Sequence, residues 1–312
     1  MTDKHVNNLP EQIGEFQNKH KQVFNMSGYA APKISTVRMG IIGTGNRGSH
    51  HAGTIARVSD VEIRAVADLS LERFERIKKT LESTDHNPEY YEGSDEGWKK
   101  LCERKDLDLV LITTPTYMHA EMAVYAMEQG KHVITEVPAA VSIKECWDIV
   151  ATSEKTKKHC MMMENYSFMP FQITSLNMAK QGFFGEIVHG DGAYNTSKMG
   201  NNFGKNMYWN MWWLRMYGNR KGNIYPTHGM GPIAQMMNIN RGDRFDFMVS
   251  MESKDFMTAA KAKELAKDDP FFEDFTKMEY RGNMNSMLIR TKQGRTLTLI
   301  FNMMPRRLLH TT

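Results

Sequence analysis

The sequence has little of what defines several protein classes. Only three cysteines occur among its 312 residues, Cys102, Cys146 and Cys160, and their spacing fits neither a disulfide framework nor a zinc site. No apolar run approaches the ~20 residues that a membrane-spanning helix needs. The net charge is only +4 and the basic residues are scattered, so no nucleic-acid interface is expected. The length suits a globular protein of two domains.

The N-terminal segment, residues 1–36, is polar and lacks the apolar centre of a secretory signal. We therefore expect an N-terminal arm, with a short amphipathic piece around Ile13 to Phe24 and a linker that ends near Pro32. Without a signal peptide the chain as given is expected in the cytoplasm, and the true compartment stays undetermined at this stage.

The most informative stretch runs from Val37 to Asp68. An apolar run, Met39 to Ile42, breaks into the glycine-rich letters GTGNRG, and a helix-spaced segment then leads to a second apolar run that ends at Asp68. Strand, glycine turn, helix, strand and acid follow one another in the order of a dinucleotide-binding βαβ unit. The alternative is a glycine turn that binds no ligand.

Each glycine of this turn has an expected task. Gly43 permits the tight turn, Gly45 lets the backbone approach a diphosphate, and Gly48 lets the helix pack closely on the strand. The diphosphate would lie at the helix N-terminus, where unpaired N–H groups and the helix dipole favour an anion. Asp68 would accept hydrogen bonds from an adenosine ribose and would repel a 2′-phosphate, so NAD is predicted rather than NADP.

The remainder of the first half alternates between strands and helices. Helical patterns at 71–81, 117–129 and 142–157 each precede an apolar run, at 107–114, 132–136 and 160–164. This alternation predicts an α/β fold with a doubly wound parallel sheet over residues 37–165. Ligands bind at the carboxyl ends of such strands, where residues 113–119, 136–137 and 164–165 fall.

The pattern changes in residues 166–312, the predicted second domain. Strand-like runs at 186–194, 245–253, 283–291 and 296–303, with helical patterns at 170–181 and 232–238, predict an α+β domain with an open, mainly antiparallel sheet. Residues 196–223 are expected to form a long loop rich in aromatic residues. These aromatics would line a sugar-binding surface or form a small local core.

Several motifs together resemble the Gfo/Idh/MocA oxidoreductase superfamily. They are GTGNRG, the strand end TTPTYMH, and TEVP at the position where most members carry E-K-P. The lysine of E-K-P serves as the acid/base of superfamily sugar dehydrogenases, and here Val137 takes its place. Since valine cannot transfer a proton, the resemblance does not imply a conventional dehydrogenase.

A more specific resemblance is to glycoside hydrolase family 109. It rests on YPTHGMGPIAQ from Tyr225, followed by NINRG, and on EVP and MMEN earlier in the chain. The resemblance implies an N-terminal Rossmann domain with an open-sheet second domain, NAD as cofactor, and hydrolysis of terminal α-N-acetylgalactosamine from glycans. It also implies a route by transient oxidation at C3, elimination, water addition and reduction, with the cofactor retained.

The same resemblance assigns roles to particular residues. His228 and Tyr225 would be catalytic, and Tyr194, Arg215 and Tyr225 would bind the sugar. A near-neutral pKa suits histidine to acid and base roles. The alternatives are a histidine packed at a turn, an ordinary strand tyrosine and a surface arginine.

The resemblance also implies a set of cofactor contacts. Besides the glycines of the turn, they are Asn46, Arg47, Asp68, Thr116, His119, Glu136, Val137, Asn165 and His228. Glu136 is expected to contact a ribose rather than to form a salt bridge. His50 and His51 lack metal-ligand spacing, so no metal site is expected.

Relatives in this family continue beyond the point where this chain stops. We therefore expect a C-terminally truncated chain whose second domain, 166–312, is incomplete, with a partial substrate pocket. Superfamily members are often oligomers that associate through the open sheet, so a homo-oligomer is a further expectation. Relatives are often exported. The functional alternatives are an NAD-dependent sugar dehydrogenase and a dinucleotide-binding protein without catalytic activity.

Overall fold

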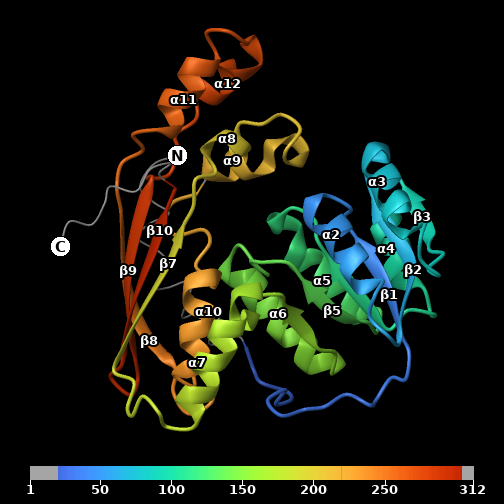
Figure 1. Cartoon of the computed structure of the whole chain (residues 1–312), viewed down its shortest axis with the longest axis horizontal. Helices are drawn as coiled ribbons and strands as arrows, with labels where there is room; N and C mark the ends of the chain where they lie inside the picture. The colour runs from blue at the N-terminus through green and yellow to red at the C-terminus, as the bar shows by residue number, and fades with distance from the viewer. Residues whose placement is uncertain (1–19, 219, 304–312) are drawn as a thin grey trace. The chain divides into compact units, whose positions relative to one another are not determined.

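The computed structural model describes residues 20–218 and 220–303 (Figure 1). Two compact units divide the chain between Met163 and Glu164, and each is described here by itself. Most of the amphipathic piece predicted around Ile13 to Phe24 lies outside the described residues. Residues 20–36 of the predicted arm contain no helix or strand.

The first unit contains a six-stranded, all-parallel sheet in the order β3-β2-β1-β4-β5-β6. Its elements are β1 (Val37–Ile42), α2 (Asn46–Ile55), β2 (Val61–Asp68), α3 (Leu71–Leu81), β3 (Glu89–Glu92), α4 (Gly97–Glu103), β4 (Leu109–Ile112), η2 (Thr116–Met118), α5 (His119–Glu128), β5 (His132–Thr135), α6 (Ile143–Thr156) and β6 (Cys160–Met162). The predicted doubly wound α/β fold is confirmed, and the strand order reverses between β1 and β4. Such a reversal is the ligand-binding point of open α/β sheets.

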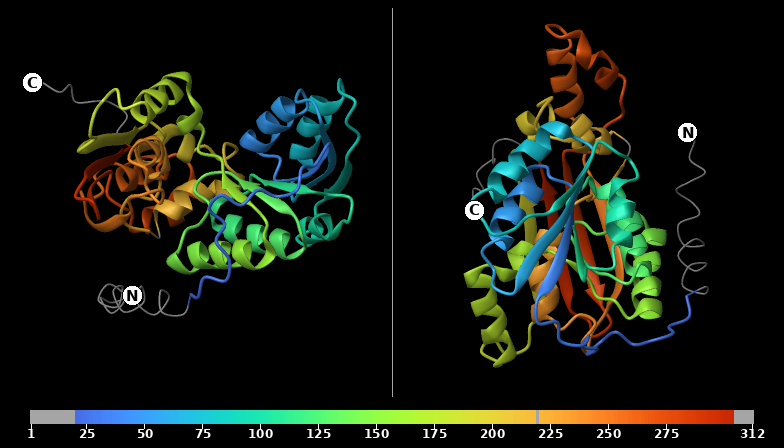
Figure 2. Two further views of the ribbon diagram at one scale, coloured as in Figure 1. Left: turned by 90° about the horizontal axis from the view of Figure 1, so that it is seen from below. Right: turned by 90° about the vertical axis from the view of Figure 1, so that its right-hand side faces the viewer.

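Helices cover both faces of this sheet, as Figure 2 shows in blue on one side and green on the other. On one face α2 and α3 bury Ala52, Phe74 and Ile77 against the strands. On the other face α4 and α5 bury Leu101 and Met122. Because both faces are covered, the central strands are almost continuously apolar, which is the pattern that made them recognisable.

A local sequence signal explains where helix α6 begins. Ser142 precedes α6 and accepts a hydrogen bond from Glu145 N at 3.2 Å, while Glu145 Oε2 accepts one from Ser142 N at 3.1 Å. This reciprocal pair is the predicted capping box. Helix α4 was not predicted, because its seven residues are too few to establish a helical period.

The second unit is built on a four-stranded sheet in the order β7-β10-β9-β8. Its elements are η3 (Asn165–Phe168), α7 (Pro170–Lys180), β7 (His189–Asn195), α8 (Met199–Asn202), η4 (Trp209–Met211), α9 (Trp212–Tyr217), α10 (Thr227–Met236), β8 (Phe245–Glu252), α11 (Thr258–Leu265), η5 (Pro270–Phe272), α12 (Glu273–Thr276), β9 (Met284–Thr291) and β10 (Thr296–Asn302). The β8–β9 and β9–β10 pairings are antiparallel, as predicted, and β7 pairs in parallel with β10. Helices α11 and α12 extend from one end of this sheet (Figures 1 and 2).

Helix α10 forms the core of the second unit together with one face of this sheet. Ile233 and Met237 pack against Met287, Leu297 and Leu299. The helix begins at Thr227, five residues before the start predicted at Pro232. Pro232 lies inside the helix as its sixth residue, so it did not mark the true start, and His228 lies on a helix rather than in a turn.

The aromatic segment 196–223 is more regular than the predicted loop. It contains the short elements α8, η4 and α9, which bury Phe203, Trp213 and Tyr217. Elements of three to six residues show no periodicity that a sequence pattern reveals. Within residues 20–218 and 220–303, no helix is both long and apolar enough to cross a membrane.

Candidate functional site

The glycine turn after β1 has the close contacts that its glycines were expected to allow. Gly43 has a φ of +92°, in the region that favours glycine. A Cβ on Gly48 would lie 2.0 Å from Gly43 O and 2.6 Å from Thr113 Oγ1. Thr113 Oγ1 also donates to Gly43 O at 2.6 Å. Helix α2 can therefore begin directly on the ends of β1 and β4 only without a side chain at Gly48.

Gly45 provides the N-cap of α2 and offers no side-chain acceptor to the first turn. Helix N-termini without such an acceptor present N–H groups to an anion. The Arg73 guanidinium approaches this glycine closely enough that a Cβ on Gly45 would be 2.6 Å from Nη1. Arg76 Nη1 donates to Asn46 Oδ1 at 3.1 Å. The turn thus combines the backbone N–H groups of a helix N-terminus with the positive charge of nearby arginines, and this cradle fits a dinucleotide diphosphate.

Asp68 ends β2 beside this cradle. Its Oδ2 accepts from Thr44 N at 2.5 Å and from Thr44 Oγ1 at 2.9 Å, and its Oδ1 accepts from Ser70 N at 2.8 Å. A carboxylate oxygen can accept a further hydrogen bond, so this arrangement fits a ribose hydroxyl.

Glu136 lies at the end of β5 and is ion-paired within the first unit. Its Oε1 accepts from Arg47 Nε at 2.8 Å and from His51 Nε2 at 2.6 Å, and its Oε2 accepts from Val137 N at 3.1 Å. Burial disfavours the carboxylate, but the hydrogen bonds from His51 and Arg47 outweigh it and lower the pKa of Glu136 to about 2. We expected a ribose contact instead of a salt bridge, and the salt bridge is present because α2 places Arg47 and His51 beside this strand end. The ribose contact itself stays a prediction.

His119 begins α5 and is 1% exposed. Its Nδ1 is 2.8 Å from Pro138 O and its Nε2 is 2.8 Å from Thr114 O. Burial lowers the pKa of His119 against the opposing effect of these carbonyls. The ring therefore holds the loops after β4 and β5 together, and both nitrogens are directed at backbone oxygens. Its predicted cofactor contact remains a prediction, as do those of the buried Thr116 and Val137.

In the second unit, Glu164 and His228 form a buried pair. His228 Nδ1 lies 2.7 Å from Glu164 Oε1 and 2.9 Å from Oε2. The side chains are 8% and 7% exposed. A ring nitrogen between two carboxylate oxygens donates its proton, so Nε2 is the nitrogen left for a ligand. Glu164 is the N-cap of η3 and was absent from the predicted site residues, although the MMEN motif contains it.

Three tyrosines surround the His228 ring. Ring centroids lie 4.4 Å away for Tyr166 and 4.9 Å away for both Tyr194 and Tyr225. Burial raises the pKa of Tyr194. The structure therefore brings together the predicted Tyr194, Tyr225 and His228, and adds Tyr166, which no motif had indicated.

Two glycines, Gly192 and Gly229, allow β7 and α10 to pack closely enough for Tyr194 and His228 to come into contact. A Cβ on Gly192 of β7 would lie 2.3 Å from Gly229 O at the start of α10. The helix therefore lies directly on the strand, one residue after His228 and two residues before Tyr194. Gly192, a glycine inside a strand, is the sequence feature that could have indicated this close packing.

Lys198 and Trp213 extend the aromatic cluster. The Trp213 and Tyr225 ring centroids are 5.5 Å apart, and Lys198 Nζ lies over both rings and over Tyr194. Trp213 belongs to the aromatic segment that was expected to line a sugar site or a local core. Lys198 was not predicted, because a single lysine in a loop carries no recognisable pattern.

Two further predicted site residues, Arg215 and Asn165, have other surroundings than the aromatic cluster around His228. Arg215 of α9 donates from Nε to Asn210 O at 2.9 Å, and its guanidinium lies 5.0 Å from the Phe275 ring. Asn165 begins η3 and is exposed. Their substrate and cofactor roles stay predictions.

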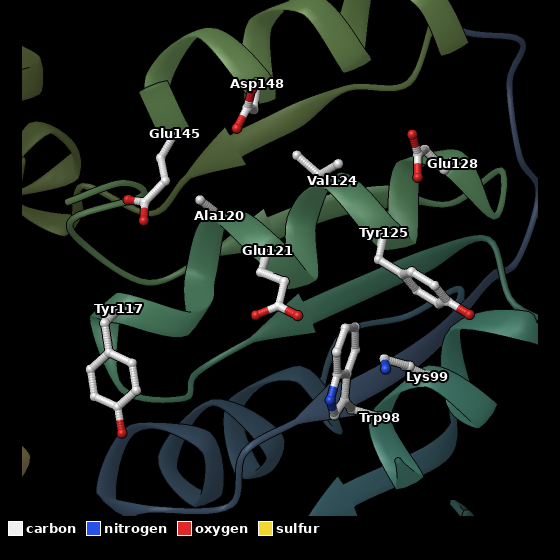
Figure 3. A pocket seen from close by; sticks show the side chains of 10 residues that line it. All are labelled: Trp98, Lys99, Tyr117, Ala120, Glu121, Val124, Tyr125, Glu128, Glu145 and Asp148. Atoms are coloured by element: carbon white, nitrogen blue, oxygen red, sulfur yellow. The ribbon is translucent and has the colours of Figure 1, made fainter. Parts of the chain in front are cut away.

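A surface hollow in the first unit lies among α4, α5 and α6 (Figure 3). Its lining consists of Trp98, Lys99, Tyr117, Ala120, Glu121, Val124, Tyr125, Glu128, Glu145 and Asp148. None of the predicted site residues belongs to it. In the part of the chain that the structure describes, no group of three or more His, Cys, Asp or Glu side chains is placed to hold a metal ion.

Comparisons with known proteins match the two units of the chain to two different families. Residues 37–164 match the family described as "Oxidoreductase family, NAD-binding Rossmann fold", and residues 170–310 match "Glycosyl hydrolase 109, C-terminal domain". "Glycosyl hydrolase family 109 protein 1" of Bacteroides fragilis is 43% identical over 279 residues, which cover 89% of this chain and 58% of that protein. An "Alpha-N-acetylgalactosaminidase" of Bacteroides fragilis is 41% identical over 280 residues, which cover 88% of this chain and 65% of that protein. The chain thus spans about three fifths of the length of these relatives.

Among solved structures, an "NAD binding oxidoreductase" from Klebsiella pneumoniae is similar with a TM-score of 0.66 and 18% identity. The match covers 86% of this chain and 67% of that one. At this identity the likeness concerns the fold alone. It is the fold expected from the resemblance to the Gfo/Idh/MocA superfamily.

Proposed function

Because this chain belongs to glycosyl hydrolase family 109, we propose that it is an NAD-dependent glycosidase that releases terminal α-N-acetylgalactosamine from glycans. The observation that carries this proposal is the buried Glu164–His228 pair inside a ring of tyrosines. Aromatic rings beside an oriented histidine suit a sugar and a proton transfer.

The first unit would hold NAD. The backbone at Gly43, Gly45 and Gly48 would bind the diphosphate, and Asp68 would bind the adenosine ribose. When bound, NAD supplies reversible hydride transfer at C3 of the sugar. Val137 at the position of the superfamily lysine supplies no proton, so the proton transfers fall to other residues.

His228 and Tyr225 are the residues suited to these proton transfers. Glu164 fixes the His228 ring, and the Nε2 lone pair can accept a proton from the sugar, which in this route comes from C2. The Tyr225 hydroxyl would act on the C3 hydroxyl, and Tyr194 would hold the sugar ring. A carbonyl at C3 makes the C2 proton removable, after which the glycosidic bond at C1 breaks and water adds there.

The test combines hydrolysis with isotope exchange. p-Nitrophenyl α-N-acetylgalactosaminide is incubated in deuterated water without added cofactor, and the released sugar is analysed for deuterium at C2. We expect hydrolysis with C2 exchange and loss of both in His228→Gln. His189→Gln changes a histidine on β7 of the same unit, 40% exposed, and should leave both intact.

Other outcomes favour other functions. Hydrolysis without C2 exchange would exclude the redox route. Steady accumulation of NADH with a free sugar would favour a sugar dehydrogenase. NAD binding without activity on any glycoside would favour a non-catalytic dinucleotide-binding protein.

A further inference from the structure

Lys198 places a positive charge against the aromatic residues of the second unit. It follows β7 and precedes α8. Its Nζ lies 5.3 Å from the ring centroid of Tyr194 and 5.8 Å from those of Trp213 and Tyr225. Two of these three rings also pack against His228. The ammonium therefore belongs to the same cluster as the residues proposed to bind the sugar.

Within the described residues, Lys198 has neither a hydrogen bond to an acceptor nor an ion pair with a carboxylate. The Glu164 carboxylate of the cluster is engaged by His228 through both oxygens. Aromatic faces attract a cation, but they do not replace the oxygen acceptors that three ammonium N–H groups prefer.

Trp213 adds a second donor without an acceptor. The residue is 4% exposed, and its buried Nε1 has no hydrogen-bond partner in the described part of the chain. Buried donors of this kind are rare in folded proteins and call for an explanation. Of the two donors, the Lys198 ammonium belongs to a partly exposed residue and can meet a ligand, whereas the Trp213 Nε1 atom is enclosed by protein.

Among the other four lysines that lie over aromatic rings in the described residues, Lys157 over Phe24 also lacks a carboxylate partner, and the remaining three have one. Lys78, Lys99 and Lys205 lie over rings of Tyr90, Trp98 and Phe271. Each of them also pairs with a carboxylate, in Glu92, Glu96 and Asp269. Lys198 differs from all four in lying over three rings of one cluster, and it has no carboxylate partner among the described residues, so its charge is available to a ligand.

We propose that Lys198 binds an anionic substituent, a sulfate ester or a carboxylate, on the sugar recognised by the second unit. The inference rests on the proposed function for the identity of that sugar. Tyrosine and tryptophan faces bind the sugar ring, while the ammonium forms a charge-assisted hydrogen bond with the anion. The preferred substrates are then α-galactosaminides that carry an anionic group, and the neutral sugar binds more weakly.

The experiment measures binding of small sugars to the full chain by isothermal titration calorimetry. The probes are methyl α-N-acetylgalactosaminide, its 4-sulfate and 6-sulfate, and methyl α-galacturonide. We expect an anionic probe to bind about tenfold or more tightly than the neutral one. The two sulfates and the uronide separate a sulfate site from a carboxylate site.

Variants identify the charge that is responsible. Lys198→Met should abolish the preference, and Lys198→Arg should retain most of it. Lys277→Met removes an exposed lysine of the same unit and should leave the preference unchanged. Circular dichroism of each variant checks folding, and the preference of the unmodified chain is decisive if Lys198→Met does not fold.

Failure of this inference is distinct from failure of the proposed function. Equal binding of neutral and anionic probes by the unmodified chain would overturn the inference, even if the neutral glycoside is hydrolysed. A preference unchanged by Lys198→Met would also overturn it. A Lys198-dependent preference without hydrolysis would support it and contradict the glycosidase.

Discussion

Glu164 binds His228 through both of its carboxylate oxygens, at 2.7 and 2.9 Å from Nδ1. The two residues come from different parts of the second unit, since Glu164 is the N-cap of η3 and His228 lies in the first turn of α10. A carboxylate in this position fixes both the orientation of the imidazole and the nitrogen that carries the proton. Glu164 is therefore a positioning residue for His228.

Replacing Glu164 by Gln should lower kcat for the α-galactosaminide about tenfold to a hundredfold. The amide retains one acceptor oxygen but can also present its NH₂ group to Nδ1, which would reverse the tautomer. NAD affinity, measured by fluorescence titration, should change much less than kcat, because most of the predicted cofactor contacts, including the glycine turn, lie in the first unit. Glu279→Gln is the control, since Glu279 is exposed and pairs with a surface lysine. An unchanged kcat in Glu164→Gln would remove Glu164 from the mechanism.

A side chain at Gly192 should separate α10 from β7. In Gly192→Ala the new Cβ would lie 2.3 Å from Gly229 O, so the backbone must shift where His228 and Tyr194 meet. We expect a loss of about 1–3 kcal/mol in the free energy of unfolding and a large loss of hydrolysis, measured by urea denaturation and by activity. Gly200→Ala in the same unit meets no atom within 4 Å and should be neutral or slightly stabilising. Equal stability of the two variants would contradict the close contact.

The preference for NAD should depend on Asp68. Asp68→Ser removes the negative charge that repels a 2′-phosphate, so the ratio of NAD to NADP affinity should fall by about tenfold or more. Calorimetric titration with each dinucleotide gives this ratio, which is insensitive to a uniform loss of folded protein. Asp85→Ser changes an exposed aspartate of the same unit and serves as the control. An unchanged ratio would assign the preference to other residues.

Acid should destabilise the first unit through Glu136. The pKa of Glu136 is lowered to about 2 in the folded chain, below its ordinary value, so its ionisation stabilises the fold above that value. This contribution, up to about 3 kcal/mol, should be lost as the pH falls from about 4.5 toward 2. Glu136→Gln lacks it, so the difference in unfolding free energy between the two proteins should shrink over this range. Urea unfolding at several pH values provides the measurement, and a constant difference would contradict the shifted pKa.

The sequence predicted most of the fold because local patterns and packing agree. In the first unit, apolar strands, glycine turn and capping box each had a strong local signal, and α3 has the predicted bounds Leu71–Leu81. The start of α10 was missed because Pro232 resembled a helix start. The elements of segment 196–223 were missed because they are too short to show a period.

The candidate site was predictable only where a motif names its residues. Tyr225 and His228 stand in one motif, and Tyr194 was supplied by resemblance. Glu164 and Lys198 reach the cluster through tertiary contacts that no spacing records. The ion pair at Glu136 was missed for the same reason, since Arg47 and His51 lie far before it in the chain.

The parallel pairing of β7 with β10 affects when the second unit can fold. Tyr194 is paired with Phe301, and the partners along these two strands are about 107 residues apart in the chain. Contacts of such high sequence separation form slowly, because a long loop must close before they contribute. During synthesis the ribosome must deliver nearly all of the described chain before β7 meets its neighbour, whereas the first unit has its whole sheet by Met162. Domains fold as units in the order in which they leave the ribosome. The Rossmann unit is therefore expected to fold first, while β7, which carries Tyr194, stays unpaired until β10 has been synthesised.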